Sequence, residues 1–159
     1  MNLHEILGRD GIDLRLSVQS DAQAIQSLVH RLVETGRLDP RHETDAILAL
    51  LKREATSGTH VGNSLAIPHA KVPYVKDFAL TLGVVHHGLQ FGGGTDPVTV
   101  VVLLLSPDWD PDGHVRLMSE IARLAMDPSF SQRITSARTV DEVLEALGAD
   151  DGPAEPATP

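Results

Sequence analysis

Residues 98–105 read VTVVVLLL, an almost unbroken aliphatic run. A strand with one wet face alternates apolar and polar residues, whereas a strand covered on both faces reads as a continuous aliphatic segment. The run therefore predicts a strand inside a sheet that has helices on both sides. Three further strands are predicted outward from it: residues 78–85 and 12–18, which alternate as half-buried strands do, and the short apolar segment 65–67, which ends before Pro68.

Helices are predicted around these strands from their end signals. Ser20 and Gln23 have the spacing of a capping box, and Thr139 and Glu142 repeat it before the last helical segment. Asp112 is the expected N-cap of the helix before that one. The predicted helices cover residues 20–36, 39–54, 113–126 and 139–148, and residues 55–64 are expected to form a loop. This order of elements predicts an α/β fold, with a mixed β-sheet flanked by helices on both faces.

The length of 159 residues indicates one domain rather than two. We assign residues 1–148 to that domain. Residues 149–159 contain Asp, Gly, Ala, Thr, Glu and three prolines. Since such a segment has nothing to bury, we expect it to form a disordered tail.

The composition excludes several classes of function. Thirteen Lys and Arg against 22 Asp and Glu give a formal net charge of -9, whereas a protein that binds nucleic acid needs a basic face. The sequence has no apolar run of about eighteen residues and no basic start followed by an apolar stretch, so we expect neither membrane insertion nor secretion. The lack of cysteine excludes disulfides and thiol chemistry. We therefore expect a cytoplasmic protein that does not bind nucleic acid.

The eight histidines are the feature of the composition that points to chemistry. His69 follows a predicted strand, at an edge where α/β sheets place their ligands, and His114 lies in the first turn of a predicted helix. Neutral imidazole is a nucleophile near pH 7 and can accept and donate a phosphoryl group. The same pair with a carboxylate is also a candidate zinc site, although no compact ligand spacing is present. For His114 a half-buried histidine with a satisfied ring is the alternative.

A second candidate site lies in residues 108–113, which read DWDPDG. The pattern matches the first half of an EF-hand calcium loop, in which Asp108, Asp110 and Asp112 would be ligands. The bidentate Glu that such a loop needs falls at Ser119, and Glu120 comes one residue too late. We therefore favour an acidic turn before a helix and keep calcium binding as the alternative.

Residues 53–70 read REATSGTHVGNSLAIPHA, which resembles the signature of the phosphotransferase-system enzyme IIA family of the fructose, mannitol and nitrogen-regulatory type. In that family an Arg-Glu pair ends a helix, and a Thr- and Gly-rich loop leads to Ala-(Ile/Val)-Pro-His. A second family histidine follows a long aliphatic strand that ends in proline, and His114 stands in that place after residues 96–107. The resemblance extends over about residues 3–147 and implies the enzyme IIA mannitol-type fold.

The resemblance also implies a protein-histidine phosphotransferase and assigns roles to the matching residues. His69 would be phosphorylated, Arg53 would contact the phosphoryl group, and His114 would lie beside His69 as a hydrogen-bonding and charge partner. It implies no metal and no organic cofactor. Further donors to the phosphoryl group are expected in the loop, at Thr56, Thr59 and Gly62. One departure is Ser64, which stands where the family loop often has Gly, so that its backbone would differ if the position needs a positive φ.

The implied partners are proteins. The donor would be the histidine-containing phosphocarrier protein, and the acceptor a IIB domain. A regulatory target protein is the other possible partner if the chain is a nitrogen-type switch, a role that we slightly favour over sugar transport. The net charge of -9 would suit a basic partner surface. A domain that binds partners without transferring phosphate is the remaining alternative.

Overall fold

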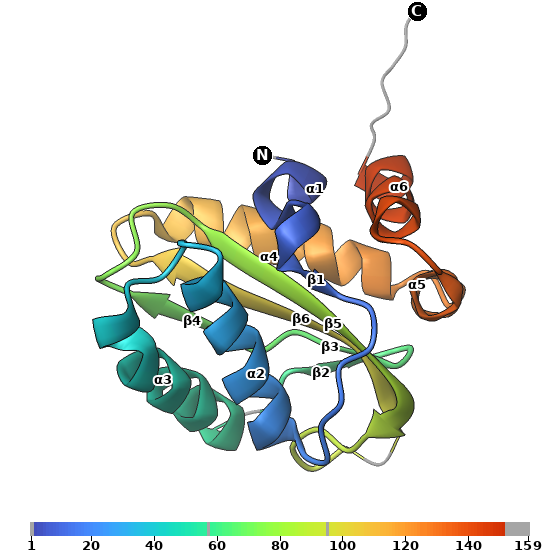
Figure 1. Cartoon of the computed structure of the whole chain (residues 1–159), viewed down its shortest axis with the longest axis horizontal. Coiled ribbons are helices and arrows are strands. Elements are labelled where there is room, and N and C mark those ends of the chain that lie inside the picture. The colour runs from blue at the N-terminus through green and yellow to red at the C-terminus, as the bar shows by residue number, and fades with distance from the viewer. Residues whose placement is uncertain (1, 57, 95, 152–159) are drawn as a thin grey trace, which may run out of the picture.

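The computed structural model describes residues 2–56, 58–94 and 96–151. The strands are β1 (Ile12–Asp13), β2 (His60–Gly62), β3 (Leu65–Ala66), β4 (His69–Val72), β5 (Ala79–Leu89) and β6 (Val98–Pro107). The helices are α1 (Leu3–Leu7), α2 (Asp21–Glu34), α3 (Glu43–Thr56), α4 (Pro111–Ala125), α5 (Phe130–Ser136) and α6 (Val140–Asp151), with 3₁₀ turns at Arg9–Gly11 and Pro40–His42. The sheet lies between two helical layers, α2 and α3 on one face and the other helices on the opposite face (Figure 1).

The long strands β5 and β6 pair antiparallel at the centre of the sheet. The strand order is β1-β5-β6-β3-β2, in which β1 runs parallel to β5 and β3 parallel to β6. β4 continues along β6 where β3 ends, so that His69 lies opposite Leu104 and Val72 lies opposite Pro107. The aliphatic run is therefore paired on both sides, and the predicted α/β fold with a mixed sheet and helices on both faces is confirmed.

Two apolar clusters join the sheet to its helical layers. Leu103 and Leu105 of β6 belong to the cluster beneath α2 and α3, whereas Val102 and Leu104 belong to the cluster beneath α1, α4, α5 and α6. Side chains of a strand point alternately to the two faces of a sheet, so an aliphatic residue at every position serves both clusters. In the described part of the chain, no helix combines the length and the apolar character needed to cross a membrane.

Two predicted helix starts are confirmed, and two differ. The helix predicted from residue 39 begins with a 3₁₀ turn at Pro40–His42, and α3 starts at Glu43. The Ser20 hydroxyl accepts a hydrogen bond from the Gln23 N–H at 3.1 Å, and the Thr139 hydroxyl accepts one from the Glu142 N–H at 3.2 Å. The N-cap of α4, however, is Asp110, whose carboxylate accepts the N–H three residues further on. The prediction of Asp112 as the cap was wrong because Pro111 occupies the first helical position, which Pro favours.

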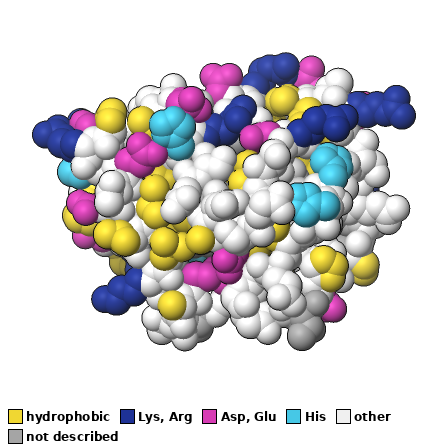
Figure 2. Space-filling view, turned by 60° about the horizontal axis from the view of Figure 1, so that its bottom comes forward, with side chains coloured by type: hydrophobic (Ala, Val, Ile, Leu, Met, Phe, Trp, Pro, Cys, Tyr) yellow, Lys and Arg dark blue, Asp and Glu magenta, His cyan; other side chains and the backbone are white. Residues whose placement is uncertain are grey.

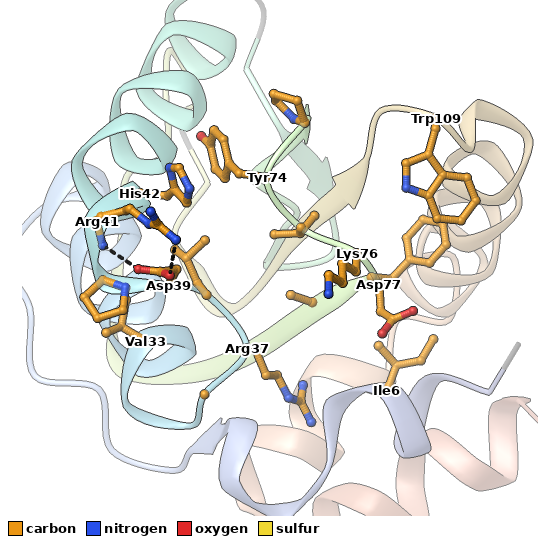
Figure 3. Close-up of a pocket in the computed structure, with 17 residues that line it drawn as sticks. Ile6, Val33, Arg37, Asp39, Arg41, His42, Tyr74, Lys76, Asp77 and Trp109 are labelled. Atoms are coloured by element: carbon orange, nitrogen blue, oxygen red, sulfur yellow. Dashed lines mark hydrogen bonds and ion pairs between the residues drawn. The ribbon is translucent and has the colours of Figure 1, made fainter.

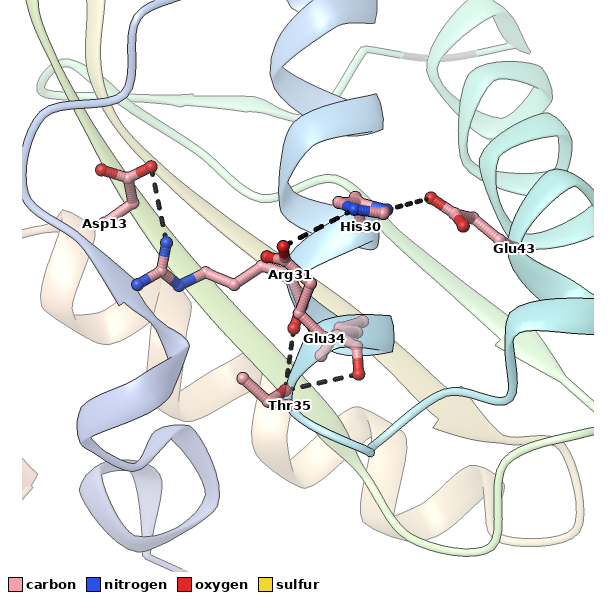
Figure 4. A network of polar contacts seen from close by, with 7 residues as sticks. Asp13, His30, Arg31, Glu34, Thr35 and Glu43 are labelled. Carbon is pink, nitrogen blue, oxygen red and sulfur yellow. Dashed lines mark hydrogen bonds and ion pairs between the residues drawn. The ribbon is translucent and has the colours of Figure 1, made fainter.

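Polar contacts tie α2 to its neighbours (Figure 4). Arg31 forms an ion pair with Asp13 at 3.6 Å, next to β1. On the other side, His30 Nδ1 lies 2.8 Å from a carboxylate oxygen of Glu43, the first residue of α3. The hydrogen bond to Glu43 raises the pKa of His30. Because both groups are partly in water, we assign this pair a small contribution to stability.

The predicted strand over residues 12–18 is wrong after Asp13. A turn follows, and two imidazoles take over part of the pairing to β5: His86 Nε2 donates to the carbonyl of Leu14 at 3.0 Å and His87 Nε2 donates to that of Val18 at 3.1 Å. Side-chain donors thus satisfy carbonyls that a regular ladder would pair with backbone N–H groups. The alternation of apolar residues persists because the segment still covers the core.

The structure contains two strands that the sequence did not predict. β2 lies within the predicted loop over residues 55–64, and β4 lies after Pro68, where a strand was expected to end. β2 pairs antiparallel with β3 through a two-residue turn, in which Asn63 has φ 52° and Ser64 has φ 67°. Beyond β3, Pro68 has no N–H to donate, yet its carbonyl accepts the Leu104 N–H at 2.9 Å. The chain therefore stays on β6 and resumes as β4, which the sequence did not predict.

At the C-terminal side, the short helix α5 was also missed. It buries Phe130 and Ile134 against the sheet. The last helix runs to Asp151 rather than ending at Gly148. Residues 152–159 of the expected tail lie outside the described residues.

Candidate functional site

Strand β6 brings the two predicted site histidines together from segments far apart in the sequence. His69 is the first residue of β4 and pairs with Leu104, and His114 lies in the first turn of α4, which directly follows β6. Their ring centroids are 5.6 Å apart and the rings are tilted by 43°. A group bound to one ring therefore lies within contact distance of the other.

The His69 ring has a defined orientation. Its Nδ1 lies 2.7 Å from the carbonyl oxygen of Ile67, and since a carbonyl only accepts, Nδ1 carries the proton and donates it. In the neutral ring, Nε2 is then unprotonated and keeps its lone pair. Pro68 between the two residues fixes one backbone torsion of this tight contact. The geometry presents Nε2 of His69 as a nucleophile.

The His114 ring is held by a residue that the sequence reasoning missed. Its Nδ1 lies 2.7 Å from the hydroxyl oxygen of Ser106, which is fully buried in β6. The position of α4 is fixed in turn by the Asp110 cap. One signal was available in the sequence, because Ser106 is the polar residue that ends the aliphatic run at residues 98–105, ahead of the helix that carries His114.

Fixed cations and burial keep both rings neutral. Burial lowers the pKa of His69; Arg53 and Lys71 lower it too, while a backbone hydrogen bond and the Glu54 carboxylate raise it. Burial, His69, Lys71 and Arg53 lower the pKa of His114 to about 4. Thus Arg53, predicted from the sequence, and Lys71, which was not, place positive charge beside two uncharged imidazoles. In a protein with a net charge of -9, this combination favours an anion.

The predicted loop donors are arranged differently from expectation. The Thr56 hydroxyl donates to the carbonyl of Lys52 at 2.9 Å, and the Thr59 hydroxyl donates to Glu54 at 2.5 Å. Both hydroxyl protons therefore already have an acceptor. Gly62 has φ 97° and open space where a side chain would begin, so its backbone is accessible. Its role as a donor to a phosphoryl group stays a prediction.

The acidic turn has a structural role. Asp110 caps α4, as described above, and no group of three or more His, Asp or Glu residues in the described ranges is arranged to hold a metal ion. The exposed side chains of Trp109 and Val115, 68% and 63% accessible, flank His114 in the sequence. An exposed aromatic and an exposed aliphatic side chain next to a site are typical of a surface that docks another protein.

A wide groove opens beside Tyr74 and Trp109. This groove of about 1310 Å³ runs between the end of α2, the 3₁₀ turn before α3 and the connection from β4 to β5 (Figure 3). Tyr74 stacks on His42 along its wall, with ring centroids 4.5 Å apart, and Trp109 lies at one end. His69 and His114 do not line it.

One face of the molecule illustrates the mixed character of the surface. Hydrophobic side chains gather in a patch left of its centre, with acidic groups at the lower border and histidines on either side (Figure 2). Most of the charged side chains on this face, of both signs, lie in its upper part and at its edges. The positive charge around His69 is thus a local feature of an acidic protein.

Comparison with known proteins points to one family. A family model described as "Phosphoenolpyruvate-dependent sugar phosphotransferase system, EIIA 2" matches residues 5–149. The chain is 33% identical over 160 residues to a 2-O-alpha-mannosyl-D-glycerate-specific EIIABC component of Escherichia coli (strain K12), covering 98% of this chain and 24% of that protein. The chain thus spans about a quarter of the length of this relative.

Two further similarities cover most of both proteins. A nitrogen regulatory protein of Bradyrhizobium diazoefficiens is 28% identical over 148 residues, 92% of this chain and 95% of that protein. Among solved structures, a complex of enzyme IIA mannitol and phosphorylated enzyme IIB mannitol from Escherichia coli matches with a TM-score of 0.76 and 25% identity, over 90% of this chain and 97% of the solved one.

Proposed function

This chain belongs to the EIIA type 2 family of the phosphoenolpyruvate-dependent sugar phosphotransferase system, and we propose that it carries the phosphoryl group on Nε2 of His69. The observation that supports this most directly is the hydrogen bond from Nδ1 to the Ile67 carbonyl. That bond leaves Nε2 as the unprotonated ring nitrogen. The ring of His114 lies next to that of His69, with the centroids 5.6 Å apart.

The proposed transfer is a displacement at phosphorus. The Nε2 lone pair of His69 forms the new N–P bond, the bond between phosphorus and the donor's ring nitrogen breaks, and that nitrogen keeps the electron pair. No proton has to leave Nε2, because it carries none. The lowered pKa of His69 keeps the ring in this neutral form at pH 7.

The neighbouring groups stabilise the phosphoryl charge in this proposal. Arg53 and Lys71 supply positive charge before and after transfer, so their contribution does not require reorganisation. The Ser106 hydroxyl oxygen lies 2.7 Å from Nδ1 of His114. In this proposal the hydroxyl donates to Nδ1, so that the proton of the neutral ring is on Nε2 and is donated to a phosphoryl oxygen. Such donors bind the transferred group without forming a bond to phosphorus.

The proposed donor is the histidine-containing phosphocarrier protein, and the proposed acceptor is a IIB domain. Support for the acceptor comes from the similar enzyme IIA mannitol, whose solved structure is a complex with phosphorylated enzyme IIB. The exposed side chains of Trp109 and Val115, which lie close to His114 in the sequence, would contact such partners. The proposed location is the cytoplasm, where phosphoenolpyruvate is formed.

A regulatory role is the second candidate function. Its support is the similarity to the nitrogen regulatory protein, which is 28% identical over 148 residues. In a regulator of this kind the phosphoryl group on His69 would change the binding of a target protein. The two roles differ in the acceptor and share the same first step.

The test is intact mass after incubation with phosphoenolpyruvate, enzyme I and the phosphocarrier protein. The wild type should gain one acid-labile phosphoryl group and His69→Ala should gain none. His30→Ala is the matched control, since His30 lies on α2 and pairs with Glu43, and it should be phosphorylated like the wild type. An unmodified wild type in the presence of charged carrier would refute the carrier function and leave the binding domain as the alternative. If the wild type is phosphorylated, a second assay measures transfer of the phosphoryl group to a IIB domain. Transfer supports the transport role, and its absence supports the regulatory role.

A further inference from the structure

A buried carboxylate lies next to the site and takes no part in the transfer described above. Glu54 is in the last turn of α3 and only 8% exposed. One of its oxygens accepts the backbone N–H of Thr59 at 3.1 Å, and the other accepts the Thr59 hydroxyl at 2.5 Å. A buried charge is costly unless it is hydrogen-bonded, and here both oxygens have a donor from the same residue.

Two glycines close the remaining space around this carboxylate. A side chain at Gly92 would begin 3.0 Å from a Glu54 oxygen, and one at Gly58 would begin 3.6 Å from the same atom. Gly92 has φ 55°, and its N–H donates to Asp21 at the start of α2. The turn after β5 is thus held against the loop after α3, with the carboxylate between them.

A continuous series of hydrogen bonds runs from Glu54 to the ring of His69. Glu54 holds the N–H and the hydroxyl of Thr59. The Thr59 carbonyl accepts the Ile67 N–H at 2.9 Å. The Ile67 carbonyl in turn accepts Nδ1–H of His69 at 2.7 Å. Thr59 and Ile67 are each held through both their N–H and their carbonyl, so displacement of Thr59 would also displace the acceptor of the His69 proton.

We propose that Glu54 is a positioning residue for His69: through Thr59 and Ile67 it fixes the ring with Nδ1 protonated and Nε2 free. The effect of Glu54 on the rate of phosphoryl transfer rests on the function proposed above, whereas its effect on the tautomer of the His69 ring does not. Hydrogen bonds of this kind behind a reacting group set its tautomer and orientation, and their loss lowers rates through misplacement.

The charge of Glu54 has a second effect on the same ring. Arg53 and Lys71 face His69 with positive charge, and His114 is its neutral neighbour. Glu54 is the group that opposes the two cations, and it raises the pKa of His69. Geometry and charge are therefore separable by substitution, since Gln keeps the shape of Glu and removes its charge.

The experiment follows the ring of His69 in the unphosphorylated protein by ¹H–¹⁵N correlation NMR, which reports the protonated nitrogen and its titration. The wild type should show Nδ1–H. Glu54→Ala should lose this preference and become a mixture of tautomers. Glu54→Gln, whose amide oxygen still accepts the Thr59 N–H, should keep Nδ1–H and lower the pKa of His69. Glu43→Gln, at the other end of α3, is the control and should change neither.

A second pair of variants covers the case in which Glu54→Ala does not fold. Thr59→Val removes the hydroxyl bond and should weaken the Nδ1–H preference, while Thr59→Ser should restore it. An Nδ1–H preference unchanged in Glu54→Ala, or in Thr59→Val where the first variant is unfolded, overturns the proposal. Where His69 is phosphorylated, Glu54→Ala should slow phosphorylation on the order of 10²-fold at saturating carrier. If the protein is never phosphorylated but its variants show these tautomer changes, the carrier function is refuted and the positioning role of Glu54 is supported.

Discussion

Substitution of Ser64 by Gly should stabilise the protein, because the backbone at this position has φ 67°. The left-handed region costs a residue other than Gly about 1–2 kcal/mol. Gly in turn loses about 0.5–1 kcal/mol of conformational freedom on folding relative to Ala. The difference predicts that Ser64→Gly raises the free energy of unfolding by about 0.5–1 kcal/mol. For a domain of this length, that corresponds to a rise of about 1–4 °C in the thermal midpoint.

The turn offers a matched control in the preceding residue. Asn63 has φ 52°, which Asn tolerates better than most residues, and its side-chain amide donates to the Ala125 carbonyl at 2.5 Å. Asn63→Gly should therefore lower the midpoint, since it loses this bond to α4. Thermal unfolding followed by circular dichroism decides the matter. An unchanged or lower midpoint for Ser64→Gly, or an equal gain for Asn63→Gly, would contradict the backbone argument.

Three further outcomes are expected. Asp110→Ala should destabilise the protein by about 1 kcal/mol through loss of the α4 cap, whereas Asp112→Ala should be nearly neutral; equal losses in urea unfolding would argue against the assignment of the cap. Since the pKa of His69 lies below its ordinary 6.5 and only the neutral ring attacks, the rate of phosphorylation should be constant from neutral pH upward and fall only below pH 6.5. A midpoint above pH 7 in single-turnover measurements would contradict this. Ser106→Ala should slow transfer about 10-fold, because it frees the His114 ring to turn, yet leave the phosphoryl group on His69; loss of that adduct by mass would mean that Ser106 serves the fold instead.

The sequence predicted those parts of the fold that depend on local signals. The run at residues 98–105 identified the central strand, and the hydroxyls of Ser20 and Thr139 marked helix starts because capping is a contact within four residues. The failures depend on distant partners. His86 and His87 satisfy carbonyls more than 60 positions away, and no pattern within residues 12–18 reveals that.

The residues of the candidate site also differ in whether the sequence could predict them. His69 and His114 were singled out from their places after a predicted strand and in the first turn of a predicted helix, and Arg53 through a resemblance. The structure brings the two rings within contact distance. Lys71 and the buried hydroxyl of Ser106 were missed, because their relevance depends on the register of β4 against β6 and on the place of α4 above it. The resemblance also led us to expect that the Thr59 hydroxyl would face a ligand, whereas it donates to Glu54.

The position of β6 has a consequence for the order in which the molecule is made. It is the last strand among the described residues, yet it pairs with β3, β4 and β5. During synthesis, the stretch that carries His69 leaves the ribosome well before residues 98–107, so β4 has to wait for its partner. Ser106 and His114 arrive later still. A nascent chain consequently cannot assemble the two-histidine site piece by piece, and any molecule that presents it has already completed its sheet.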